Sequence, residues 1–375
     1  MITAADLLEG PRGRRFILEI LRQLLDDESG PGEHLHQVLF WAEYHVMFER
    51  GDAPTLFGPG ADRREPAPSD QELVDALRAA VDVADPSSVQ PVHVLRALAD
   101  TAAAARYWQE PDGEDVLLAR AGLGPELARL ARAWAGDLAV GAVVAPSDTA
   151  VPWSTVFDGA HGPEPLRSTA PGDAARALRD WRRALQAAVD AVGWRDRRRR
   201  VDARYSGEWW STPPSGLLVT TPSVPSHGPL GVWAVEDDMG WERATVTPVV
   251  PREGARELVL DDADDWAALC RRWPIDVSWT TRRHDWYRTT GRDGGWVTPD
   301  WEGVAEAYDA VCLTVRCWLR AAGTAIPVGA DTASVIAGWT PGSTVWLRDP
   351  VPPADAPRAV DLVFDNDRLQ WHRSD

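Results

Sequence analysis

The sequence predicts an α+β protein, in which an all-helical N-terminal domain precedes a tryptophan-rich, mixed α+β domain with a mainly antiparallel sheet. In the first part of the chain, apolar residues recur at three- and four-residue spacing, which is the period of an amphipathic helix. Beyond residue 200, short β-rich segments alternate with turn residues, and 14 of the 20 tryptophans lie there. Strands and helices do not alternate regularly, so a βαβ repeat is not expected.

Helical signals cover residues 1–138, which we assign to the first domain. Ser69, followed three residues later by Glu72, has the pattern of a capping box, and Pro91 suits a first helical turn. We expect helices over 14–25, 33–49, 70–83, 91–108 and 113–136.

Residues 139–172 are rich in Pro, Gly and Ser and predict a long connection. The second domain, 173–375, then opens with a helix over 173–195. Two further helices are expected, over 262–272 and 299–308. Strands are expected over 207–211, 217–221, 231–235, 244–250, 256–260, 310–318, 333–338, 343–347 and 360–364.

The charge balance is 39 basic against 57 acidic residues, a formal net charge of −18. An acidic chain repels nucleic acid and anionic membrane on average, so neither is an expected partner. Every basic residue is arginine. The lack of lysine excludes the usual forms of Schiff-base catalysis, the Walker lysine and the kinase lysine. Codon bias of a GC-rich genome explains this composition, and evasion of lysine-directed tagging predicts the same observation.

Other reaction classes lack their motifs. The chain has three cysteines and eight histidines, in no recognised metal-ligand spacing, and we expect no metal site. Neither Gly-x-Ser-x-Gly nor Gly-x-Gly-x-x-Gly occurs. No apolar run approaches the length of a membrane helix, and no signal pattern opens the sequence, so the cytoplasm is the expected compartment.

The strongest functional pointer is 281–292, where four arginines and one histidine are interleaved with Trp and Tyr. Such a composition suits phosphate contact by Arg283 and Arg288 together with ring stacking. His284 is the candidate acid or base. The alternative is a loop that pairs with acidic residues of the same protein.

Residues 204–214 form a second candidate. Arg204 suits bidentate phosphate recognition, and Trp209 and Trp210 offer faces for a ring, unless these side chains belong to a core strand. In 235–243, three adjacent acids include Glu236 and could hold a cation or a hydroxyl-rich ligand, or form a solvated hairpin tip.

Three further segments have two interpretations each. The run 195–204 holds six arginines and two aspartates, which is typical of a helix end and also suits phosphate contact. The polar and aromatic residues of 106–115 predict a contact surface between the domains. Residues 337–347 predict a structural hairpin whose Ser–Thr pair could instead serve a ligand.

Residues 200–350 resemble ADP-ribosyltransferase-like domains. One branch of that family uses an Arg on an early strand, a Ser/Thr-rich strand and a later catalytic Glu. The resemblance assigns Arg204 to the first role and Thr220 or Ser211-Thr212 to the second. By order along the chain, Glu236 or Glu257 would take the third, because strand 343–347 carries no Glu. NAD would then be the cofactor. The chain also resembles uncharacterised proteins of high-GC bacteria, which implies no chemistry.

These observations together predict a cytoplasmic nucleotide-binding protein, in its sharpest form an ADP-ribosyltransferase-like enzyme that uses NAD. The alternative is a non-catalytic protein-interaction component, such as an immunity or adaptor protein. The expected catalytic residues are His284 and Glu236. The expected cofactor-binding residues are Arg204, Trp209, Trp210, Thr220, Arg283 and Arg288.

Overall fold

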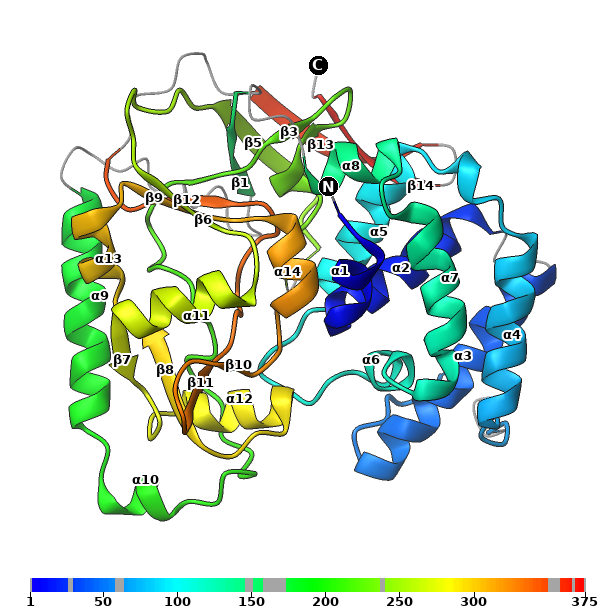
Figure 1. The fold of residues 1–375 in the computed structure, drawn as a ribbon, viewed down its shortest axis with the longest axis horizontal. Helices are drawn as coiled ribbons and strands as arrows, with labels where there is room; N and C mark the ends of the chain where they lie inside the picture. Colours follow the sequence, from blue (N-terminus) through cyan, green and yellow to red (C-terminus); the bar gives the residue numbers. More distant parts are fainter. Residues whose placement is uncertain are drawn as a thin grey trace.

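The computed structural model describes residues 2–25, 30–57, 64–145, 151–157, 173–236, 240–349, 358–365 and 368–373. Helices make up the N-terminal part of the chain, and the C-terminal part combines helices with small sheets (Figure 1). The predicted α+β class is therefore confirmed. The proposed domain boundaries stay a prediction.

The N-terminal part consists of consecutive helices. They are α1 (Ala4–Glu9), α2 (Pro11–Leu24), α3 (Gly30–Arg50), α4 (Asp70–Val83), α5 (Pro91–Ala103), α6 (Gly113–Leu118), α7 (Gly124–Trp134) and α8 (Leu138–Val144), with short 3-10 helices η1 (Pro86–Ser88) and η2 (Ala121–Leu123). The Ser69–Glu72 capping box is formed at the start of α4. The helix predicted over 113–136 is divided at η2, next to Gly124 and Pro125.

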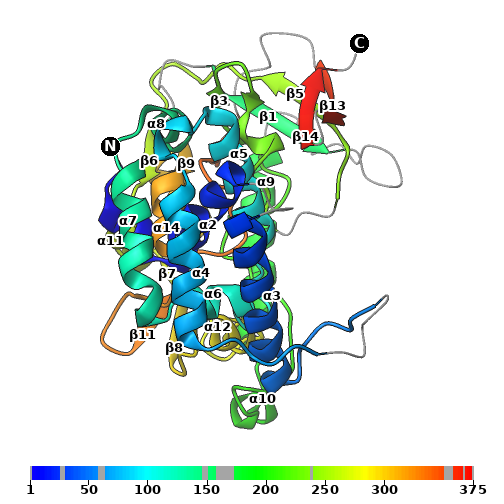
Figure 2. The ribbon, with the colours of Figure 1, turned by 90° about the vertical axis from the view of Figure 1, so that its right-hand side faces the viewer.

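Helix α2 is the centre of this part. Its apolar side chains Phe16, Ile17, Leu18, Ile20 and Leu21 are fully buried, and α2 packs against α1, α5 and α14 (Val315–Ala321). Figure 2 shows α3, α4 and α7 standing beside one another on the outer side. At Gly10, between α1 and α2, an added Cβ would collide with the backbone carbonyl of Arg320 at the end of α14. Glycine at this position lets the helical part approach the C-terminal part closely.

The C-terminal part adds helices and short strands. The remaining helices are α9 (Asp173–Asp190), α10 (Trp194–Arg198), η3 (Leu230–Val232), α11 (Ala263–Arg272), α12 (Arg282–Thr290) and α13 (Trp301–Ala307). The strands are β1 (Trp153–Phe157), β2 (Val219–Thr220), β3 (Ser223–Val224), β4 (Gly228–Pro229), β5 (Arg243–Pro248), β6 (Glu257–Leu260), β7 (Pro274–Asp276), β8 (Gly295–Pro299), β9 (Ala310–Leu313), β10 (Ile326–Pro327), β11 (Thr332–Ser334), β12 (Thr344–Trp346), β13 (Arg358–Asp365) and β14 (Arg368–Arg373).

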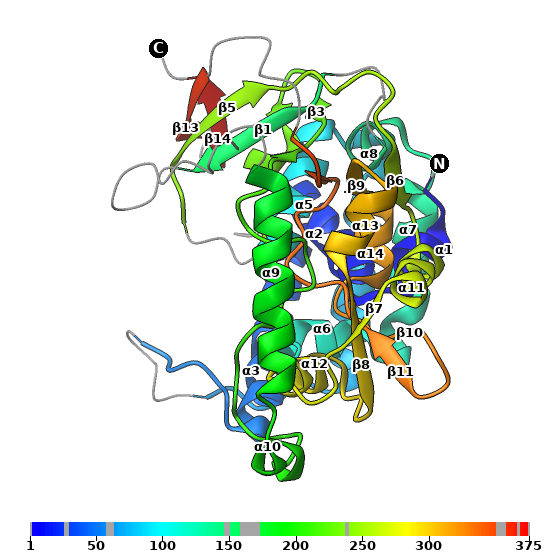
Figure 3. The ribbon, with the colours of Figure 1, turned by 90° about the vertical axis from the view of Figure 1, so that its left-hand side faces the viewer.

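Several small sheets take the place of one large sheet. In the described residues the strand orders are β1-β5-β13-β14, β10-β11-β8-β7, β2-β12-β9-β6 and β3-β4. Most pairings are antiparallel, as predicted, and β6–β9 and β8–β11 are parallel. Figure 3 shows long helix α9 along one side of the molecule, with α10 at its lower end.

Tryptophan rings fill the core of the C-terminal part. Trp266, Trp301 and Trp339 contact one another, with ring centroids 5.9 to 6.3 Å apart. Trp286 and Trp296 form a second buried pair at 5.3 Å. These rings belong to the same continuous core as the apolar faces of the N-terminal helices. The tryptophan enrichment beyond residue 200 is thus largely explained by packing.

Several sequence predictions are wrong in detail. Residues 207–211 form no strand, and 231–235 begin within helix η3. The segment 310–318 is a strand that turns into α14, because Thr314 caps a new helix. Residues 281–292 are not a loop but contain helix α12. The predicted connection 139–172 contains most of α8 and strand β1, and 146–150 and 158–172 lie outside the described residues.

None of the helices in the described ranges combines the length and the apolar character needed to cross a membrane.

Candidate functional site

The segment between α5 and α6 joins the helical part to the C-terminal part. The Arg288 Nε donates to the carbonyl of Trp108 at 3.1 Å, and the Thr289 hydroxyl donates to that of Tyr107 at 2.9 Å. The Trp108 ring lies 5.1 Å from that of Trp209. The prediction that 106–115 forms a contact surface is confirmed for these residues.

A cleft of about 460 Å³ opens along this junction. Its volume falls within the range of small-molecule sites in proteins. The end of α3, the α5–α6 segment and the chain after α10 each contribute to its walls. The lining residues are Met47, Arg50, Asp52, Trp108, Gln109, Glu110, Pro111, Asp112, Arg204, Ser206 and Arg288.

Arg204 is an accessible cation of this cleft. Its side chain is 79% exposed, and a guanidinium nitrogen lies 2.9 Å from a carboxylate oxygen of Asp52, at the opposite wall. Arg50 donates to the carbonyl of Pro111 at 2.9 Å. Arginines and acids are equal in number in the lining, so the cleft is balanced in charge.

Arg288 has a different role from the one expected for a phosphate ligand. Its guanidinium donates to the carbonyls of Trp108, Ala203 and Tyr205 and pairs with the carboxylate of Asp285. These bonds hold the two walls of the cleft together. The residue lines the cleft, but most of its donors are used inside the protein.

His284 and Arg283 are not among the described residues that line the cleft. The His284 Nδ1 donates to the carbonyl of Val201 at 2.9 Å, and burial lowers the pKa of this imidazole. The Arg283 guanidinium donates to the carbonyl of Arg199 and lies 5.0 Å from the centroid of the Trp279 ring. Polar side chains of the buried helix α12 thus form hydrogen bonds with the backbone of the chain that follows α10.

Trp209 and Trp210 line a second hollow of about 430 Å³. Trp210 is 39% exposed, whereas Trp339 in the same wall is buried. Hydroxyl groups, prolines and tryptophans surround this space, and no ionisable side chain of the described residues lines it. Because Trp108 belongs to the cleft and contacts Trp209, the two hollows meet at this pair of rings.

Thr220 is buried, and Glu236 is partly buried. The Thr220 hydroxyl accepts a hydrogen bond from the Trp346 Nε1 at 3.0 Å. The Glu236 carboxylate accepts from the Trp318 Nε1 and from the backbone N–H of Gly338. Burial raises the pKa of Glu236 to about 8, against these hydrogen bonds, which lower it. Neither Thr220 nor Glu236 is among the described residues that line the cleft with Arg204.

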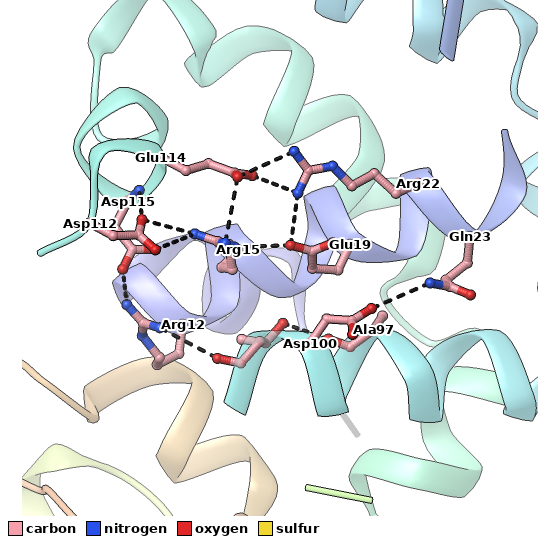
Figure 4. Close-up of polar contacts among 11 residues, drawn as sticks. Arg12, Arg15, Glu19, Arg22, Gln23, Ala97, Asp100, Asp112, Glu114 and Asp115 are labelled. Carbon is pink, nitrogen blue, oxygen red and sulfur yellow. Dashed lines mark hydrogen bonds and ion pairs between the residues drawn. The ribbon is translucent and has the colours of Figure 1, made fainter. Parts of the chain in front are cut away.

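A buried ion cluster lies behind the cleft, and sequence reasoning missed it. Figure 4 shows its side chains between α2, α5 and α6. Arg12 pairs with Asp115, Arg15 lies 3.0 Å from Asp112, and Arg22 lies 2.9 Å from both Glu19 and Glu114. Its members are Arg12, Arg15, Glu19, Arg22, Asp112, Glu114 and Asp115.

The cluster contains more carboxylates than arginines. Burial raises the pKa of Glu114 and of Asp115, against the neighbouring arginines. Two carboxyl groups beside it are affected in the same way, because burial raises the pKa of Glu43 to about 7 and that of Asp100 to about 6. Asp112 lines the cleft and also pairs with Arg15 of the cluster. The charged groups of the cleft are therefore connected to those of the buried ion cluster.

Other reactive groups offer no additional site. In the described part of the chain, no group of three His, Cys, Asp or Glu side chains is arranged to hold a metal ion. Burial raises the pKa of the Cys270 thiol to about 12 and also raises that of Cys317. These thiols behave as small apolar side chains of the core.

Comparison with protein-family models, with curated proteins and with solved structures finds no match to this chain. The geometry of the site therefore carries the functional argument.

Proposed function

We propose that this protein binds a nucleotide in the cleft between the helical part and the C-terminal part. The observation that carries the proposal is the placement of an accessible guanidinium, Arg204, and the Trp108 ring in the same cleft of about 460 Å³. A phosphate and a planar ring are the two groups that arginine and tryptophan bind best.

Binding would exchange one ion pair for another. Arg204 now contacts Asp52, and an exposed pair of this kind contributes only about 0–1 kcal/mol. A phosphate that accepts two parallel hydrogen bonds from the same guanidinium is a stronger partner. Arg50, on the same lining, would be a second positive charge for the ligand.

The enzymatic form of the proposal needs a different carboxylate from those the sequence favoured. Neither His284 nor Glu236 is among the described residues that line the cleft. Asp52 pairs with Arg204, and Asp112 with Arg15. Glu110 is exposed at the cleft, and an ADP-ribosyltransferase-like reaction would use it to stabilise the oxocarbenium-like centre.

Thermal unfolding with NAD, ADP-ribose, ATP and GTP tests the proposal. A ligand at 100 times its dissociation constant adds about 2.7 kcal/mol to the stability of the native state, so Tm rises. We expect Arg204→Ala to weaken binding at least tenfold. Arg176→Ala is the matched control, because Arg176 is an exposed, ion-paired arginine on α9. No shift with any of these nucleotides, or equal affinity for both variants, contradicts the proposal.

A protein-binding role is the second candidate, and the exposed Trp210 favours it. Exposed tryptophans are common hot spots of interfaces. Under this proposal the Trp210→Ala variant loses a partner that the Arg204→Ala variant keeps. A partner captured equally by the wild type and by Trp210→Ala would not use this surface.

A further inference from the structure

The chain around α10 forms an exposed surface of arginines and aromatic rings. Trp194 is 65% exposed, Tyr205 44% and Trp279 41%. We call this the arginine–aromatic surface; its members are Trp194, Arg195, Arg197, Arg198, Arg199, Tyr205 and Trp279.

Each ring of this surface has at least one guanidinium over it. Arg195 and Arg198 lie 5.7 and 5.6 Å from the centroid of Trp194. Arg197 lies 5.5 Å from the centroid of Trp279, whose ring also contacts Arg283. These contacts hold several flexible arginine side chains beside flat, accessible rings. Because these side chains are already ordered, binding of a ligand costs less conformational entropy.

The positive charge of the surface is largely uncompensated. In the part of the chain that the structure describes, no carboxylate forms an ion pair with Arg195, Arg197 or Arg198. Asp196 accepts from the backbone N–H of Gly193 and lies 3.7 Å from Arg199. Unpaired arginines are notable in a chain with a net charge of −18, since carboxylates are abundant.

The position of the surface leaves it open to a large partner. Helix α10 lies at one end of the molecule, below α9 and at the opposite end from strands β13 and β14 (Figures 1 and 3). An indole ring as exposed as that of Trp194 contributes little to the core. Its exposure is more simply explained by a role in binding.

We propose that the arginine–aromatic surface binds single-stranded nucleic acid. Guanidinium groups contact the phosphates of such a strand, and aromatic side chains stack on its unpaired bases. A bound strand would thus use both components of this surface. The net negative charge of the chain argued against nucleic acid, but the separation of charge along the fold leaves a positive region at α10.

An anionic membrane fits the surface less well. Insertion into the interface of a bilayer requires an apolar helical face, and α10 has only five residues, four of them charged. No large exposed aliphatic side chain lies among the described residues 191–206 and 279–284. The proposal does not depend on the nucleotide cleft, because none of the surface residues lines that cleft.

Fluorescence anisotropy with labelled 20-nucleotide oligo(dT) and oligo(U) tests the proposal across a salt titration. Each phosphate contact with a single strand contributes about −0.7 to the slope of log K against log salt. Replacing Arg195, Arg197 and Arg198 together by Ala should therefore make the slope shallower by about 2. The control removes three exposed arginines of α9, Arg176, Arg179 and Arg183, and should leave the slope unchanged.

The Trp194→Ala variant separates stacking from charge. Since stacking on one base is worth about 1–3 kcal/mol, affinity should fall at least fivefold with no change in salt slope. Circular dichroism melting confirms that the variants stay folded.

Four results would overturn the proposal. The first is no binding of either strand at 20 mM salt, and the second is a salt slope that becomes equally shallow in the α9 control. The third is equal affinity for a single strand and for a duplex of the same length. The fourth is binding to anionic vesicles without binding to nucleic acid.

Discussion

The indole rings of Trp108 and Trp209 lie 5.1 Å apart and join the helical part of the chain to the C-terminal part. Trp209 also contacts Tyr107 and Trp210, so it stands at the centre of an aromatic group. The cleft and the second hollow meet at this contact. Its integrity therefore bears on both the stability of the protein and the shape of the proposed nucleotide site.

We expect Trp209→Ala to lower the free energy of unfolding by about 2–3 kcal/mol. A fully buried tryptophan costs about 3–5 kcal/mol when truncated, and Trp209 is only partly buried. Urea denaturation followed by circular dichroism measures the loss. Trp194→Ala is the control, with an expected change within about 0.5 kcal/mol, because Trp194 is exposed. Equal losses in the two variants would show that the aromatic group does not support the junction.

The buried ion cluster predicts a large cost when one partner is removed. Arg12→Met leaves the carboxylate of Asp115 without its closest cation, and both side chains are buried. Breaking such a pair destabilises a protein by about 3–5 kcal/mol. The same substitution at Arg120, whose partner Asp70 is exposed, should cost about 1 kcal/mol or less. Chemical denaturation distinguishes the two, and similar values for both would contradict the role assigned to burial.

Two glycine-to-alanine substitutions should act in opposite directions. At Gly113 an added Cβ would lie 2.5 Å from the Glu43 Cγ and 2.8 Å from the Glu43 carbonyl oxygen. Forcing α3 and α6 apart should cost about 1–3 kcal/mol. At Gly141, inside α8, an added Cβ meets no atom within 4 Å. Alanine there should stabilise the protein by about 0.5–1 kcal/mol, because it reduces the entropy of the unfolded chain. The change in Tm relative to the wild type measures both effects, and changes of the same sign in the two variants would contradict this packing.

Glu236 should make stability fall as pH rises. Burial raises its pKa from 4.5 to about 8 in the folded protein. Between these values the folded carboxyl keeps a proton that the unfolded chain has released. Its contribution is thus fully present below pH 4.5 and is lost as pH rises through about 8.

The Glu236→Gln variant removes this titration. From pH 5 to pH 8, the wild type should lose up to about 1.4 kcal/mol per pH unit more than the variant. The comparison uses the slope against pH, since the amide changes the hydrogen bonds to Trp318 and Gly338 at every pH. Parallel curves for the two proteins would mean that Glu236 keeps an ordinary pKa.

Local signals in the sequence were sufficient for several N-terminal helices and for the fold class, but not for α8 or α12. The period of apolar residues and the Ser69 capping box predict α4 with its observed bounds. These signals act between residues three or four positions apart, so no distant contact is needed to interpret them.

Only the tertiary structure decided what the arginines do. The sequence presents 281–292 and 195–204 as similar basic segments. In the fold, Arg288 is buried and bonded to Trp108, 180 residues earlier in the chain, whereas Arg195, Arg197 and Arg198 remain exposed. The buried ion cluster likewise joins α2 to α6. A charged side chain stabilises the fold when the fold brings distant carbonyls or carboxylates to it, and it is available for binding when the fold does not. Residue type and spacing alone do not contain that information.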